Sequence, residues 1–125
     1  MILGIGIDLV DIPRLEGVLE RHQGRAHTRL FTAQEIEYCN TAGRPGESFA
    51  ARFAAKEAFF KAVRAGWGQG VTWTEVEVVS APSGAPDLQL HGGAKQRAEQ
   101  LGARRIHLTL THSGQTAAAF LILEG

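Results

Sequence analysis

The stretch from residue 51 to residue 66, ARFAAKEAFFKAVRAG, has the composition of a helix that is apolar on nearly all sides. At about 100° per residue, its phenylalanines fall on one side of the axis and most of its alanines on the other. A helix of this kind is normally buried between other elements. Yet it carries Glu57 and Lys61 one turn apart, between those two sides. Because buried charges are costly unless they are paired, these two either satisfy each other or meet a charged partner.

The segments around this helix, which we expect over residues 47–65, alternate between strand and helix periods. The patterns predict strands at 2–10, 71–79, 87–91, 105–112 and 116–124, and further helices at 11–26, 32–41 and 93–102. The sequence TAQE gives the 32–41 helix a capping box, and the last two strands form a hairpin. This order predicts an α+β fold with a mainly antiparallel sheet packed with helices.

Length and composition narrow the class of protein. We expect residues 1–125 to form a single domain. The 13 basic and 13 acidic side chains cancel, which argues against general affinity for nucleic acid or membranes. The lone cysteine, Cys39, excludes an internal disulfide and a cysteine-based zinc cage, and it suits a cytoplasmic location. The start MILGIGIDLVD is apolar but short, so we predict neither a signal peptide nor a membrane span.

The first predicted strand places Asp8 on the same face as Gly4 and Gly6. The other face carries the apolar residues Leu3, Ile5, Ile7 and Leu9. Glycine removes side-chain bulk, so one interpretation is a clear space beside the carboxylate that could take a ligand or an ion. The alternative is a solvated strand face that ends in a helix cap.

Asp8 and Glu57 come from different predicted elements. Two carboxylates are a typical protein share for Mg²⁺, which takes its other oxygens from water and phosphate. Lys61 would then meet a phosphoryl oxygen. The alternative is a surface ion pair between Glu57 and Lys61, which would stabilise the helix by a few tenths of a kcal/mol, about the value of such pairs in helices.

Four motifs, in this order and at these separations, resemble those of the holo-acyl-carrier-protein synthase family, the short bacterial 4′-phosphopantetheinyl transferases. They are GIGIDLVDIPRLE at 4–16, FTAQE at 31–35, RFAAKEAFFKA at 52–62 and LTLTHSG at 108–114. The resemblance covers nearly the whole chain. It implies transfer of 4′-phosphopantetheine from coenzyme A to a serine of apo-acyl carrier protein, with release of 3′,5′-ADP, in fatty acid biosynthesis. It also implies a homotrimer with sites at subunit interfaces.

The same resemblance implies roles for individual residues. Asp8 and Glu57 correspond to the magnesium ligands of the family, and Lys61 to the lysine that meets the pyrophosphate of coenzyme A. The serine must lose a proton, and either Glu57 or a water held by the metal would accept it. Phosphoryl transfer otherwise asks the protein mainly to position groups and to neutralise charge.

Arg52 and His112 resemble residues that bind coenzyme A near its 3′-phosphate, and Arg44 is a further candidate for that role. The chain departs from the family pattern at two places. Ala51 stands where the family usually has glycine, and AGWGQG at 65–70 replaces the usual Gly-Thr-Gly. We therefore expect a differently shaped loop along the pantetheine.

The predicted 11–26 helix carries Arg14, Arg21 and Arg25 on one stripe, with Val18 at its centre. Such a strip suits an acidic helix with one apolar anchor, which is what an acyl carrier protein would present. The alternative is a solvated basic face.

Two other functions are compatible with the same residues. In a binding module the carboxylates would be structural, and in a magnesium-dependent phosphohydrolase water would be the acceptor. Incubation with coenzyme A, with and without apo-carrier protein, separates the three.

Overall fold

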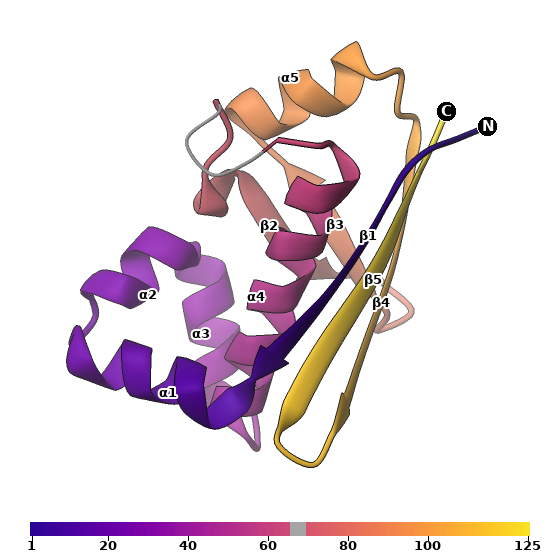
Figure 1. The fold of residues 1–125 in the computed structure, drawn as a ribbon. Helices are drawn as coiled ribbons and strands as arrows, with labels where there is room; N and C mark the ends of the chain where they lie inside the picture. The colour runs from indigo at the N-terminus through magenta and orange to yellow at the C-terminus, as the bar shows by residue number, and fades with distance from the viewer. Residues whose placement is uncertain (66–69) are drawn as a thin grey trace.

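The computed structural model of the protein describes residues 1–65 and 70–125 (Figure 1). Within these residues, one antiparallel sheet has the order β1 (Ile2–Asp11), β5 (Thr116–Glu124), β4 (Arg105–Ser113), and another pairs β2 (Val76–Ser80) with β3 (Pro86–Leu90). The helices are α1 (Ile12–Arg21), α2 (Arg25–Leu30), α3 (Ala33–Thr41), α4 (Pro45–Ala62) and α5 (Gly92–Gln100), with a 3₁₀ helix η1 (Trp73–Glu75). The predicted α+β class with antiparallel sheets is confirmed.

Helix α4 runs along one face of the β1-β5-β4 sheet, and α1, α2 and α3 gather on its other side (Figure 1). The contact between α4 and β1 needs glycine. A Cβ atom at Gly4 would collide with the carbonyl oxygen of Ala62, and one at Gly6 with that of Ala58. The clear space considered on this face is therefore closed at the two glycines, because the backbone of α4 fills it, and it stays open beside Asp8.

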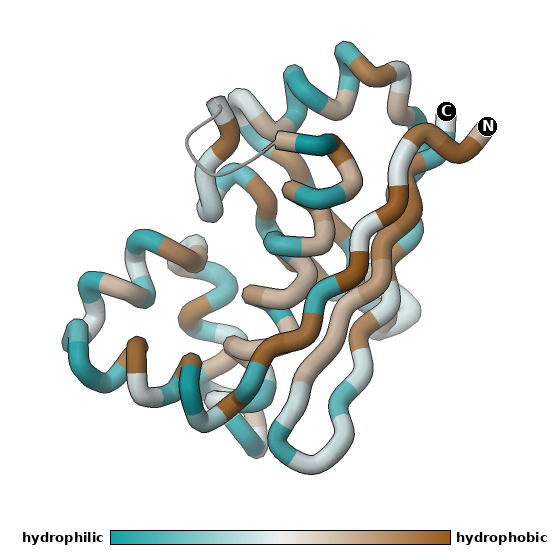
Figure 2. Tube along the Cα trace, viewed as in Figure 1, coloured by the Kyte–Doolittle hydropathy of each residue, from teal (hydrophilic) through white to brown (hydrophobic). Residues whose placement is uncertain are grey.

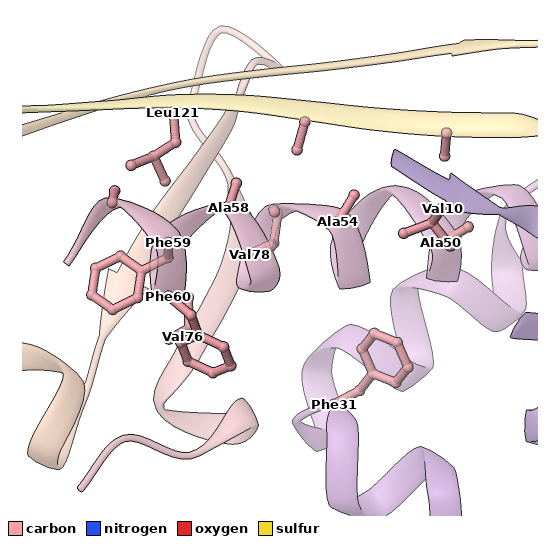
Figure 3. Close-up of a cluster of buried hydrophobic side chains, with 14 of the residues drawn as sticks. Val10, Phe31, Ala50, Ala54, Ala58, Phe59, Phe60, Val76, Val78 and Leu121 are labelled. Carbon is pink, nitrogen blue, oxygen red and sulfur yellow. The ribbon is translucent and has the colours of Figure 1, made fainter. Parts of the chain in front are cut away.

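The two sides of α4 bury different kinds of residue. Figure 3 shows Ala54 and Ala58 facing strand β5, from which Leu121 points toward the helix. Phe31 and Phe60 lie on the far side of α4 from the sheet. The alanines let the strands approach closely, and the aromatic side supplies bulk for the rest of the core.

The outer face of the sheet leaves apolar residues in solvent. Ile5, Ile7 and Leu9 of β1 are 61%, 59% and 70% exposed, and Phe120, which pairs with Ile7, is 40% exposed. The brown segments of β1 in Figure 2 belong to this alternation. A row of this kind in a chain otherwise well packed indicates an interaction surface.

The predicted 11–26 helix is wrong in its length, because the structure breaks it into α1 and α2. Gln23 and Gly24 have φ angles of 44° and 91°, in the left-handed region that a right-handed helix cannot contain. Gly24 adopts this conformation without a steric penalty. Residues after Arg21 therefore leave the axis of α1.

The predicted 71–79 strand also needs correction, since β2 begins only at Val76. Thr72 and Glu75 form a capping box around η1, which replaces the first half of the expected strand. Helix α4 begins at Pro45, two residues before the predicted start, with the proline in the first turn, and it ends three residues early at Ala62. In residues 1–65 and 70–125 no helix is long and apolar enough to cross a membrane.

Candidate active site

Asp8 and Lys61 meet where β1 crosses α4. The Lys61 Nζ donates to Asp8 Oδ1 at 3.0 Å and to the Ile7 carbonyl oxygen at 2.9 Å. The ion pair of Lys61 is therefore with Asp8, and not with Glu57 as the alternative interpretation of the sequence had it. The side chain of Asp8 is only 15% exposed, so this carboxylate holds its position beside the helix.

Glu57 lies in the same cavity as Asp8 but forms no ion pair with Lys61. No residue in the described part of the chain forms a hydrogen bond or ion pair with its carboxylate. Burial raises the pKa of Glu57, the negative charge of Asp8 raises it further, and Lys61 opposes both effects. Two carboxylates of this kind have more negative charge than Lys61 alone can neutralise, which suits a hard divalent cation.

Residues 1–65 and 70–125 contain no group of three or more His, Cys, Asp or Glu side chains that could hold a metal ion. Asp8 and Glu57 would supply two carboxylates. Mg²⁺ tolerates this share because it keeps several waters and binds substrate phosphate oxygens. The donor set of Asp8 and Glu57 therefore fits Mg²⁺ bound together with a phosphorylated substrate.

These carboxylates open into a cavity of about 520 Å³, which we call the acidic cleft. Its other lining residues include Arg14, Val18, Leu30, Phe53 and Trp73. The rings of Phe53 and Trp73 stack with centroids 5.0 Å apart. The sequence interpretation missed this aromatic wall, although the TWTE spacing at 72–75 is the signal that would have placed Trp73 in a capped turn.

A second cluster lies at the start of α4. The Glu47 carboxylate bridges two of the predicted coenzyme A ligands: its Oε2 is 3.5 Å from Arg44 Nη1, and its Oε1 is 3.3 Å from His112 Nε2. All three residues line a cavity of about 290 Å³, together with Ala51. Sequence reasoning missed Glu47, for which an acid in the first helical turn was the available signal.

Arg52 lies apart from this second cavity. It is 7% exposed, its Nη1 donates to Ser48 Oγ at 3.0 Å, and its guanidinium carbon lies 4.1 Å from the centroid of the Tyr38 ring on α3. Its Nε has no hydrogen-bond partner among residues 1–65 and 70–125. The structure therefore holds the Arg52 guanidinium against α3, while Ser48 lines the cavity with His112.

The two clusters occupy opposite edges of the β1-β5-β4 sheet. Asp8 pairs with Ala119 on β5, and Ala119 pairs with Leu110 on β4, two residues before His112. Helix α4 covers the sheet between them (Figure 1). The structure thus brings Asp8, Glu57 and Lys61 together, and Arg44 and His112 together, and within the described part of the chain the two sets belong to separate cavities.

The predicted arginine stripe is only partly present. Arg14 lines the acidic cleft, and Arg21 is the last residue of α1. Arg25 opens α2, beyond the left-handed break, so its place on the same helical stripe is wrong. Of the loop expected to be reshaped at 65–70, residues 66–69 lie outside the described part of the chain.

Fold and site together define a class of protein. An antiparallel sheet and a central helix hold two carboxylates in one cleft, one of them paired with a lysine, and this arrangement suits a metal-bound phosphate. The model of the 4′-phosphopantetheinyl transferase superfamily matches residues 4–120, and the chain belongs to that superfamily.

Within the superfamily, the chain is similar over its length to proteins named holo-[acyl-carrier-protein] synthase. That of Koribacter versatilis is 48% identical over 124 residues, covering 99% of both chains. The crystal structure of the Neisseria meningitidis protein has a TM-score of 0.91, with 30% identity over 100% of both chains. That of the Bacillus anthracis protein, in complex with CoA (3′,5′-ADP), has a TM-score of 0.79 and 33% identity, covering 98% of this chain and 96% of that one. The resemblance of the four motifs to this family is confirmed.

Proposed function

We propose that this protein transfers 4′-phosphopantetheine from coenzyme A to a serine hydroxyl of apo-acyl carrier protein. The observation that carries the proposal is a cleft lined by Asp8 and Glu57, with Lys61 paired to Asp8, in a chain of the transferase superfamily. The serine oxygen attacks the β-phosphorus, the bond to the bridging pyrophosphate oxygen breaks, and 3′,5′-ADP leaves with that electron pair. The proposal covers residues 1–125 as one transferase domain.

Asp8 and Glu57 are the residues that would hold Mg²⁺, since they are the paired carboxylates of the cleft. The ion would neutralise the pyrophosphate and make its phosphorus more electrophilic. Lys61 stabilises the negative charge that grows on the departing nucleotide. Glu57 lines the cleft, where it would take the serine proton, and a water beside Glu57 is the alternative acceptor.

The separation of the two clusters supports a homotrimer with shared sites. Arg44 and His112 are the proposed ligands of the coenzyme A 3′-phosphate, and Arg52 is bonded to Ser48 in the wall of the same cavity. His112 lies at the opposite edge of the sheet from Asp8. A neighbouring copy could supply the missing half to each cleft. The exposed row of Ile5, Ile7, Leu9 and Phe120 supports the same assembly, because association would cover it.

Arg14 on the wall of the acidic cleft, with Arg21 at the end of α1, is the proposed docking surface for the carrier protein. The apolar lining from Val18, Leu30 and Phe53 would receive one apolar anchor from an acidic helix. A cytoplasmic location belongs to the proposal, with the lone Cys39 as its support.

One assay tests the proposed function. The protein is incubated with coenzyme A and Mg²⁺, with and without apo-carrier protein, and the carrier is weighed by mass spectrometry. We expect a carrier heavier by one phosphopantetheine and 3′,5′-ADP in equal amount, both abolished by chelation of the metal. Nucleotide release without a carrier would indicate a phosphohydrolase. Carrier binding without any turnover would indicate a binding module.

A further inference from the structure

Lys56 and Glu35 form an ion pair that plays no part in the chemistry described above. The Lys56 Nζ lies 2.8 Å from Glu35 Oε1, and both side chains are fully buried. The two residues are 21 positions apart, on α4 and α3. Ion pairs buried this completely seldom stabilise a fold more than apolar residues of the same volume would. Their presence here suggests a geometric purpose.

Apart from the bond between the two side chains, the hydrogen bonds of the pair all run to backbone groups. Besides Glu35, the Lys56 ammonium donates to the carbonyl oxygens of Trp73 at 2.9 Å and Val76 at 2.6 Å, which uses its three hydrogens. Glu35 accepts from the backbone N–H of Val78 with Oε2 and from that of Thr32 with Oε1. One charged pair thus connects α3, α4, η1 and β2.

Trp73 is the point where this network reaches the acidic cleft. Its carbonyl is bound by Lys56, and its ring lines the cleft and stacks on Phe53 with an interplanar angle of 22°. The ring also contacts Phe60, with centroids 4.9 Å apart. Phe53 and Glu57 are four residues apart on α4, so they face the cleft together, while Lys56 holds the Trp73 backbone from behind.

We propose that Lys56 and Glu35 are positioning residues that hold Trp73 as a preformed wall of the acidic cleft for the carrier protein. The wall lines the acidic cleft together with Val18 and with Arg14 of the proposed docking surface, whereas Arg44 and His112 line a separate cavity. The pair therefore shapes the part of the site that would receive the carrier, and not the cavity of the proposed 3′-phosphate ligands. This inference rests on the proposed function and adds to it a determinant of carrier recognition.

The test replaces both charges at once, by Lys56→Met with Glu35→Gln, because Lys56→Met alone would leave a buried carboxylate without a partner. Trp73 is followed in the whole protein by ¹⁹F NMR after 5-fluorotryptophan labelling, and its resonance is assigned with Trp73→Phe. We expect the Trp73 resonance of the double variant to shift and broaden. The KM for carrier protein should rise about tenfold, as for a misplaced binding wall, while the Kd of coenzyme A stays within about twofold.

Leu123→Ala is the matched control. It truncates a buried side chain on β5, on the sheet side of α4, and should lower the melting temperature without moving the Trp73 resonance or the carrier KM. An equal rise of the carrier KM in Leu123→Ala would overturn the inference. A double variant with the wild-type Trp73 resonance and the wild-type carrier KM would overturn it too.

Trp73→Ala keeps the inference testable if the double variant does not fold. Removal of the ring should raise the carrier KM and spare coenzyme A binding, and an unchanged carrier KM would refute the role of the wall. The ¹⁹F spectrum needs no substrate. A wild-type protein that transfers nothing would therefore refute the proposed function, while the spectrum still reports whether the pair holds Trp73.

Discussion

The ammonium of Lys61 lies 3.0 Å from the carboxylate of Asp8, although the two residues are 53 positions apart in the chain. One of the two proposed magnesium ligands is therefore neutralised by the protein itself, and Glu57 is not. A cation that binds both carboxylates must compete with Lys61 for Asp8. The lysine is then free to turn to the phosphate oxygens of the substrate.

Replacement of Lys61 should separate metal binding from catalysis. We expect Lys61→Ala to lower kcat about 100-fold, the usual cost of losing one group that stabilises transition-state charge. Its Kd for Mg²⁺, measured by calorimetry, should be equal to or lower than that of the wild type, because Asp8 loses its competitor. Lys95→Ala, which removes an exposed lysine on α5, is the control. Weaker Mg²⁺ binding in Lys61→Ala would contradict this account.

The raised pKa of Glu57 predicts a stability difference that depends on pH. The folded protein holds a proton on Glu57 above the ordinary pKa of 4.5, so ionisation of Glu57 costs folding free energy as the pH rises through that raised pKa. Without Mg²⁺, Glu57→Gln should therefore be more stable than the wild type at pH 7. The difference should vanish below a pH of about 4.5, where Glu57 is protonated in both states.

Urea denaturation at several pH values measures this difference. Addition of Mg²⁺ with coenzyme A should reverse the order at pH 7, because ligands that bind only the folded wild type stabilise it. Glu37→Gln, at an exposed position of α3, is the control and should show no such reversal. Equal stability of Glu57→Gln and the wild type at every pH would mean that burial does not raise the pKa of Glu57.

The parts of the fold that could be predicted are those with local signals. The TAQE box at 32–35 and the alternation of the C-terminal hairpin depend on neighbours in sequence, and both elements formed where expected. The buried face of β1 could not be predicted from its pattern. The alternation of apolar residues favours burial of the face that carries the isoleucines. The structure instead buries the face of Gly4 and Gly6, because α4 approaches β1 closely there.

The site shows the same division. Asp8, Glu57 and Lys61 came from motifs, and the structure brings them together. The Lys56–Glu35 ion pair could not be predicted from the sequence pattern. The two residues are far apart in the chain, and their burial results from packing. Lys56 is the next residue to Glu57, but it leaves α4 about 100° around the axis and is enclosed by the core.

The proposed assembly predicts that its exposed apolar row is an interface. Ile7→Glu should convert a trimer into monomers, because a carboxylate at the centre of the row would be buried without a partner on association. Light scattering at assay concentration measures the mass. Gln89→Glu, which adds the same charge at an exposed position of β3, should leave the mass unchanged. A wild-type protein that is monomeric and fully active would contradict the prediction.

Shared sites also predict complementation between two inactive variants. Asp8→Ala removes one half of a site, and His112→Ala with Arg44→Ala removes the other. In randomly mixed symmetric trimers, about one quarter of the interfaces would combine two intact halves, so co-expression should restore about one quarter of the activity. Mixtures that stay inactive, although trimers form, would place both halves of each site in one protomer.

We expect carrier docking to depend on Arg14 more than on the other two arginines of the predicted stripe. Arg14 lines the acidic cleft, Arg21 ends the same helix, and Arg25 lies beyond the break. Charge reversal by Arg14→Glu should therefore raise the carrier KM most, Arg21→Glu less and Arg25→Glu least. The effect should be larger at low salt, because screening weakens steering between exposed charges.

The measurement is the initial rate of transfer against carrier concentration at two ionic strengths, with the Kd of coenzyme A for each variant. That Kd should stay nearly unchanged, because the proposed 3′-phosphate ligands His112 and Arg44 line a cavity separate from the one that Arg14 lines. Arg104→Glu is the matched control, since it reverses an exposed charge just before β4, away from α1, and should leave both constants unchanged. Equal losses for carrier and coenzyme A, or losses as large in Arg104→Glu, would show that α1 is not the docking surface. The order Arg14, Arg21, Arg25 also tests the break at Gly24 in solution, because a continuous helix would give the three arginines similar effects.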